Sequence, residues 1–132
     1  MLTWCDGLAD IDLVDLLAFH RDHGRLATLS AVHPPPRFGR LILDGATVCD
    51  FREKTVDPNE WINGAYFVLE PTVLDLIEDD DTHFESQTIV RLAHDGDLKA
   101  YRHESFWRCM DTLKEAQTLN ALWREGRAPW KR

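Results

Sequence analysis

The segment from Phe51 to Pro71, FREKTVDPNEWINGAYFVLEP, constrains the fold more than any other part of the 132-residue chain. Its second half, Ile62–Leu69, is rich in β-branched and aromatic residues and predicts a strand. Its first half places Glu53 and Lys54 after an apolar, strand-like run and before a polar loop. Because ligands often bind where the strands of an α/β sheet end, we expect these polar ends to meet at one site.

Two interpretations of this segment remain open. In the first, Asn63 hydrogen-bonds the hydroxyls of a sugar, Gly64 lets the ligand approach the backbone, and Lys54 meets a phosphate. In the second, Glu53 and Lys54 form a solvated surface pair, and the Asn-Gly dipeptide is an ordinary turn.

The rest of the chain mixes helical and β-rich patterns. Apolar residues at helical spacing predict a helix that is capped by Asp10 and ends near Gly24, whereas Pro34-Pro35-Pro36 ends a β-rich run. Further expected elements are a hairpin around Asp44-Gly45, helices that open at Pro71 and Asp111, a helix over 85–94, and short strands over 99–102 and 105–109. These patterns predict one α/β domain over residues 1–132, with a mixed β-sheet flanked by helices.

Charge and composition exclude several classes of partner. The chain carries 23 acidic and 15 basic residues, and its formal net charge of −8 disfavours binding to nucleic acid or to anionic membranes. No apolar run is long enough to span a membrane. Cys5, Cys49 and Cys109 are widely spaced and odd in number, which predicts reduced, mostly buried thiols in a cytoplasmic protein.

Two aspartates stand where predicted elements meet. Asp6 follows the first β-rich run, and Asp111 lies between a predicted strand and the last helix. If both strands belong to one sheet, the two carboxylates could bind Mg²⁺ together with the phosphates of a nucleotide. The alternative is that Asp111 caps the helix and that Asp6 is a turn residue.

No pattern indicates a protein nucleophile or a zinc site. The sequence contains no GxSxG motif, no glycine-rich phosphate loop and no adjacent Cys/His pair, and its six histidines are scattered. A catalytic role would therefore depend on positioning and on charge neutralisation.

Several segments together resemble the sugar-1-phosphate nucleotidyltransferases, and within this family the glucose-1-phosphate cytidylyltransferases. The matching segments, in order, are CDGLADIDLVDLLAFHRDHG, the PPxRFG pattern at 34–39, FREK, INGAYFVLEPTVLDLI, FWRCMDTL and ALWREGRAPWK. They run from Leu2 to Lys131, and the resemblance is to the C-terminal half of the family.

The resemblance implies a role for each candidate residue. Asp6 and Asp111 would hold Mg²⁺ against the nucleotide phosphates, and Lys54 would neutralise the sugar phosphate. Glu53 and Asn63 would hydrogen-bond the hexose, while Gly64 would let it pass close to the backbone. The implied reaction is an in-line attack of the sugar phosphate on the α-phosphorus of CTP, which releases pyrophosphate.

The sequence departs from the family in ways that bear on activity. The family's GGxGTR loop, which belongs to its N-terminal half, does not occur in these 132 residues, Cys5 stands where a glycine is usual, and Thr55 stands where a proline is usual. We therefore expect this chain to be inactive unless a separate N-terminal half is supplied. We also expect it to form a homo-oligomer, such as a dimer, that covers apolar surface next to the first strands.

Three functions follow as alternatives. The chain could be part of a glucose-1-phosphate cytidylyltransferase, a non-catalytic sugar-phosphate-binding or structural remnant of that family, or an unrelated α/β domain. A neighbouring reading frame that encodes the GGxGTR half would favour the first.

Overall fold

The computed structural model describes residues 1–131. The strands are β1 (Leu2–Thr3), β2 (Gly7–Ala9), β3 (Ala27–Val32), β4 (Arg40–Asp44), β5 (Thr47–Arg52), β6 (Ile62–Leu69), β7 (Leu98–His103) and β8 (Trp107–Cys109). The helices are α1 (Leu13–His23), a 3₁₀-helix (Pro71–Leu76), a π-helix (Phe84–Ile89) that continues into α2 (Val90–His94), and α3 (Leu113–Arg124).

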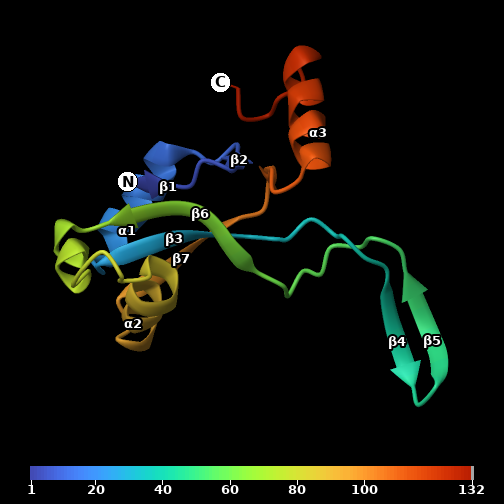
Figure 1. Cartoon of the computed structure of the whole chain (residues 1–132), viewed down its shortest axis with the longest axis horizontal. Helices are drawn as coiled ribbons and strands as arrows, with labels where there is room; N and C mark the ends of the chain where they lie inside the picture. The colour runs from blue at the N-terminus through green and yellow to red at the C-terminus, as the bar shows by residue number, and fades with distance from the viewer. Residues whose placement is uncertain (132) are drawn as a thin grey trace.

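Four strands form the main sheet, in the order β1-β6-β3-β7. Strand β3 pairs antiparallel with β6 and parallel with β7, so the sheet is mixed. Neighbouring residues of β6 face opposite sides: Val68 packs with Leu16 of α1, whereas the ring of Phe67 meets that of Phe84 in the π-helix. Helices therefore cover both faces, as Figure 1 shows, and the predicted fold class is confirmed.

Helix α1 begins two residues later than the sequence suggested. Asp12, and not Asp10, is the N-cap, because its carboxylate accepts hydrogen bonds from the backbone N–H groups of Val14 and Asp15. Gly24 ends the helix at φ 60°, where a side chain would be strained, as its position predicted.

Two predicted helices have irregular hydrogen bonding. The segment that opens at Pro71 is a 3₁₀-helix, and the segment predicted over 85–94 starts as a π-helix before it becomes α-helical. The three acidic residues that follow Glu78 disfavour a longer α-helix at Pro71, because they oppose the macrodipole at its C-terminus.

A β-bulge in β6 shapes the edge of the sheet near the candidate site. The register between β3 and β6 shifts after Leu29, which lies opposite Phe67, so that Ala31 lies opposite Asn63. Within the bulge, Ala65 has φ 65°, a left-handed conformation that costs a residue with a Cβ roughly 1 kcal/mol. Bulges bend a strand and reorient its side chains, and Asn63 is the paired residue directly before this bulge.

The hairpin β4–β5 projects away from the main sheet. Figure 1 shows it at the far end of the molecule, joined to the sheet by the extended segments 33–39 and 53–61. Gly45 in its turn has φ 55°, which confirms the predicted hairpin. Five of its large apolar side chains are more than half exposed, namely Leu41, Ile42, Leu43, Val48 and Phe51.

A hydrogen-bonded chain ties α1 to β3 and β6. Arg25 donates its backbone N–H to His23 Nδ1 (2.9 Å), so the ring proton of neutral His23 is on Nε2, which donates to Thr28 Oγ1 (2.7 Å). The Thr28 hydroxyl then donates to His20 Nδ1 (2.8 Å), and His20 Nε2 donates to Glu70 (3.2 Å). The arrangement requires His23 to be neutral, because its Nδ1 accepts from the backbone N–H of Arg25.

Acid is expected to destabilise the fold through His23. Burial, followed by the nearby His20, lowers the pKa of His23 below its usual value of 6.5, so the unfolded chain binds more protons than the folded chain in this range. The stabilisation is present above pH 6.5 and is lost as pH falls toward the lowered pKa. Urea unfolding at pH 7.5 and 5.5 should show a smaller loss of stability in His23→Gln than in the unchanged chain, whereas an equal loss would contradict this role.

The cysteines are more exposed than the sequence suggested. Cys5 and Cys49 are exposed and Cys109 is half-buried, so the prediction of mostly buried thiols is wrong, and the three form no disulfide within residues 1–131. Cys5 lies in the turn that follows the edge strand β1, and Cys49 lies in β5 of the projecting hairpin, which accounts for their exposure. No helix in the described part of the chain is both long and apolar enough to cross a membrane.

Candidate functional site

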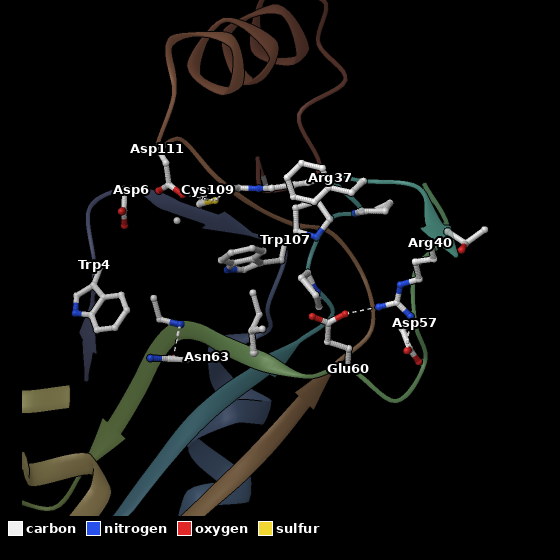
Figure 2. Close-up of a pocket in the computed structure, with 18 residues that line it drawn as sticks. Trp4, Asp6, Arg37, Arg40, Asp57, Glu60, Asn63, Trp107, Cys109 and Asp111 are labelled. Carbon is white, nitrogen blue, oxygen red and sulfur yellow. Dashed lines mark hydrogen bonds and ion pairs between the residues drawn. The ribbon is translucent and has the colours of Figure 1, made fainter. Parts of the chain in front are cut away.

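A cavity of about 550 Å³ lies between the sheet, the β2–β8 ribbon and the stem of the hairpin. Its lining comes from five segments that are distant in sequence: Trp4 to Gly7, Pro34 to Arg40, Thr55 to Glu60, Ile62 to Ala65, and Trp107 to Asp111. Figure 2 shows the residues that contribute side chains. The cavity brings together Asp6, Asn63 and Asp111 of the predicted site.

The two aspartates meet because β2 and β8 pair. Gly7 lies opposite Cys109, and the backbone N–H of Met110 donates to the carbonyl of Asp6 at 2.9 Å. The side chains of Asp6 and Asp111 thus emerge at the same end of this ribbon, as Figure 2 shows. Two carboxylates beside an open cavity suit Mg²⁺, which takes one or two protein carboxylates and fills its octahedron with phosphate and water.

Asp111 is not the helix cap. Thr112 caps α3, since its hydroxyl accepts from the N–H of Glu115 (3.2 Å), and Glu115 in return accepts from the N–H of Thr112 (2.9 Å). The alternative role for Asp111 as the helix cap is therefore wrong. Because Thr112 satisfies the helix terminus, the carboxylate of Asp111 is available to the cavity.

Arg37 is the nearest cation to Asp111. Its Nη2 lies 3.2 Å from Asp111 Oδ2 and 3.2 Å from Glu115 Oε1. The hydrogen bond to Asp111, together with the charge of Glu115, raises the pKa of Arg37 above its already high ordinary value. Burial and the neighbouring Asp111 raise the pKa of the Cys109 thiol, so Cys109 remains protonated beside these groups.

Cys109, Asp111 and Glu115 place their ligand atoms within 4.8 Å of one another. This set does not suit Mg²⁺, because it includes a thiol with a raised pKa, and Mg²⁺ prefers oxygen. Glu115 is also engaged in the helix cap and with Arg37. The Asp6–Asp111 pair is therefore the better candidate for a magnesium site.

Asn63 uses one end of its amide in the fold. Its Oδ1 accepts from the N–H of Ala65 at 2.8 Å, which supports the bulge, and this leaves the Nδ2 group as the donor for a ligand. Asn63 lines the cavity, so hydrogen bonding to a sugar remains a prediction that its position supports.

Gly64 has a packing role that the sequence did not reveal. A Cβ at this position would lie 2.6 Å from Ser30 Oγ and 2.8 Å from Val32 Cγ1, and the carbonyl of Gly64 accepts from the indole of Trp107 at 2.8 Å. Close contact between β3 and β6 thus requires a glycine here, independently of any ligand.

Glu53 and Lys54 lie outside the cavity. They form an exposed pair at the end of β5, with Lys54 Nζ 3.5 Å from Glu53 Oε1. Thr55, the next residue, does line the cavity, and Lys54 has a left-handed φ of 48°, which is uncommon for a residue with a side chain. The structure therefore brings Asp6, Asn63 and Asp111 together and leaves the Glu-Lys pair at the periphery.

Sequence reasoning missed both arginines of the cavity as site residues. Arg40 pairs with Asp57 and with Glu60 (2.6 Å to Glu60), which ties the hairpin stem to the following loop. The backbone N–H of Asn59 and then Arg40 lower the pKa of Asp57. In the sequence, the signal for Arg37 and Arg40 was their position after the proline run. Trp61, which directly precedes β6, packs its ring against that of His33, with ring centres 3.9 Å apart.

Comparison with solved structures identifies the class of fold. A Bacillus anthracis protein assigned as a glucose-1-phosphate thymidylyltransferase, solved in complex with sucrose, superposes with a TM-score of 0.60 at 17% identity. The match covers 91% of this chain and 52% of that one. The chain therefore has the fold of a nucleotide-sugar transferase.

Comparison of sequences identifies the family more closely. The chain is 44% identical over 131 residues to the glucose-1-phosphate cytidylyltransferase of Salmonella typhi. The aligned region covers 99% of this chain and 51% of the relative. A Bacillus subtilis protein assigned the same activity is 39% identical over 132 residues, with 99% and 52% covered. The mannose-1-phosphate guanylyltransferase catalytic subunit beta of Dictyostelium discoideum is 31% identical over 122 residues, with 89% and 33% covered. No family model matches the chain.

The chain is homologous to the sugar-1-phosphate nucleotidyltransferases, and it corresponds to the C-terminal half of glucose-1-phosphate cytidylyltransferase. It spans about half the length of these cytidylyltransferase relatives.

Proposed function

We propose that this chain carries the sugar-phosphate-binding and metal-binding half of a glucose-1-phosphate cytidylyltransferase site. The family reaction joins CTP and glucose 1-phosphate to give CDP-glucose and pyrophosphate. The observation that carries the proposal is the cavity in which Asp6, Asn63 and Asp111 meet from three separate segments. Its size suits a ligand larger than a few waters, since small-molecule sites are usually about 300–1,000 Å³.

Each residue has a stated role in this proposal. Asp6 and Asp111 would hold Mg²⁺, which when bound neutralises phosphate charge and orients the reacting groups. Asn63 would donate Nδ2–H to a sugar hydroxyl. Lys54 and Glu53 would reach the sugar phosphate and the hexose only after the end of β5 moves toward the cavity, because both are exposed outside it.

Catalysis by the 132 residues alone is not part of the proposal. The triphosphate-binding GGxGTR loop of the family is not encoded in them, and each lost donor to a transferring phosphate costs roughly 10²–10³ in rate. The peripheral position of Glu53 and Lys54 favours the second candidate, a non-catalytic domain that retains only the fold or a weak sugar-phosphate site.

Location and domain count belong to the same proposal. The cytoplasmic location stays a prediction, which rests on the odd number and wide spacing of the three cysteines in the sequence. We treat residues 1–132 as one domain, as the sequence predicted.

Binding of CDP-glucose with Mg²⁺ tests the proposed site. By calorimetry, Asp111→Asn should weaken Mg²⁺-dependent binding at least tenfold, because it removes one of two anionic metal ligands. Asn63→Ala should weaken binding about fivefold, with or without the metal, because a sugar hydrogen bond is lost. Asp75→Asn and Asn59→Ala, both exposed outside the cavity, serve as matched controls. No heat at millimolar ligand would favour the non-catalytic alternative.

Self-association through the projecting hairpin is a further part of the proposal. The exposed apolar side chains of β4 and β5 form a surface that a second copy of the chain could bury. Light scattering should show an oligomer that Leu41→Glu with Phe51→Glu reduces to a monomer. Val14→Glu, which changes a still more exposed apolar side chain on α1, should leave the oligomer intact. A monodisperse monomer of the unchanged chain would defeat this proposal.

A further inference from the structure

Arg37 makes a contact that links two distant parts of the cavity. It follows Pro34-Pro35-Pro36, a run with restricted φ, and its guanidinium reaches a carboxylate 74 positions further along the chain. Figure 2 shows its side chain directed toward Cys109 and Asp111, at the end of the cavity where Asp6 also lies. The same nitrogen, Nη2, lies 3.2 Å from both Asp111 Oδ2 and Glu115 Oε1.

The side chains of Glu115 and Asp111 differ in how firmly the fold holds them. Glu115 Oε2 accepts from both the N–H (2.9 Å) and the hydroxyl (3.0 Å) of Thr112, so the helix cap fixes this side chain. Only Oε1 then faces Arg37. Asp111 has no such role in the cap, and its side chain is half exposed. Arg37 therefore bridges a fixed carboxylate and the carboxylate assigned to the metal pair.

We propose that Arg37 is a positioning residue that occupies Asp111 when the metal is not bound and competes with the divalent cation for it. The inference rests on the proposed function, since it requires Asp111 to be a metal ligand. Two cations a few ångströms apart repel, so a cation bound at Asp111 weakens the pairing with Arg37. Glu115 then keeps Arg37 in the cavity, where its planar N–H fork suits a phosphate.

Arg40 provides the internal comparison. It lines the same cavity, but its guanidinium pairs with Asp57 and Glu60 instead of with the metal pair. Removing either arginine removes the same unit charge from the cavity, so a difference between the two variants reflects the position of Arg37 beside Asp111.

Titration of the chain with Mn²⁺, followed by the electron paramagnetic resonance signal of the free ion, tests the inference. Arg37→Ala should tighten Mn²⁺ binding about thirtyfold, the factor expected for one unit charge about 4 Å from a doubly charged ion in water. Arg40→Ala and the charge-preserving Arg37→Lys should bind with nearly unchanged affinity. Asp111→Asn should abolish the gain when it is combined with Arg37→Ala.

The outcomes separate the inference from the proposed function. If the unchanged chain and Arg37→Ala bind Mn²⁺ with equal affinity, and Asp111→Asn removes binding from both, the role of Arg37 is overturned. The proposed metal site is then still supported. Mn²⁺ binding that is unchanged by Asp111→Asn would overturn both the inference and the proposed metal site. The absence of Mn²⁺ binding even in Arg37→Ala would also overturn both. If Arg40→Ala raises the Mn²⁺ affinity as much as Arg37→Ala does, the effect is explained by the net charge of the cavity. This result would also overturn the inference.

Discussion

Supplying the nucleotide-binding half of a glucose-1-phosphate cytidylyltransferase as a separate chain is expected to yield CDP-glucose formation that neither half gives alone. The reason is that the proposed metal ligands and the proposed sugar contact lie in this chain, whereas the family's GGxGTR loop does not. Release of pyrophosphate, measured with both chains together and with each chain alone, detects the effect.

Substitution of Asp111 in the paired chains should then remove most of this activity. Asp111→Asn should lower kcat/KM by roughly 10²–10³, the usual loss when one charge-stabilising group is removed. Asp75→Asn, which changes an exposed aspartate outside the cavity, should have no comparable effect. Two halves that form a stable complex yet release no pyrophosphate would contradict the catalytic interpretation and favour the non-catalytic remnant.

Gly64→Ala is expected to destabilise the fold by about 3 kcal/mol, at the upper end of typical overpacking costs. The added methyl group would lie 2.6 Å from Ser30 Oγ, 2.8 Å from Val32 Cγ1 and 3.2 Å from the carbonyl oxygen of Ser30, so a backbone atom is among those that must move. Strands β3 and β6 would have to separate, and the hydrogen bond from Trp107 to the carbonyl of Gly64 would be strained.

Gly7→Ala is the matched control for this change. The nearest atom to a Cβ at Gly7 is 3.7 Å away, an ordinary contact, although Gly7 itself lines the cavity. Urea unfolding should show a large loss of stability for Gly64→Ala and a small one for Gly7→Ala. Equal stability of the two variants would show that the sheet relaxes around Gly64, and that a ligand rather than packing explains the glycine.

The sequence predicted those features that depend on local backbone chemistry. Gly24 ends α1 and Gly45 turns the hairpin because both adopt left-handed φ values that favour glycine. The mixed sheet also followed from the order of β-rich and helical runs. By contrast, the choice between Asp10 and Asp12 as the helix cap depends on a two-residue offset that apolar spacing does not resolve.

Contacts between distant segments were beyond sequence reasoning. The cavity role of Asp6 and Asp111 was predicted through family resemblance, but the pairing of Arg37 with Asp111 joins residues 74 apart and has no local pattern. Gly64 illustrates the same limit, because its packing need arises from Ser30 and Val32 on another strand. The expected convergence of Lys54 with Asn63 does not occur, because the hairpin carries Lys54 to an exposed position.

The most direct test of the central claim is the position of a bound metal. A crystal of the chain grown with CDP-glucose and Mn²⁺ would locate the ion by its anomalous scattering. The account predicts an anomalous peak coordinated by the carboxylates of Asp6 and Asp111, with the diphosphate of the ligand in the same cavity. A peak coordinated instead by Cys109 and Glu115, or an ordered ligand without any metal at Asp6 and Asp111, would contradict it.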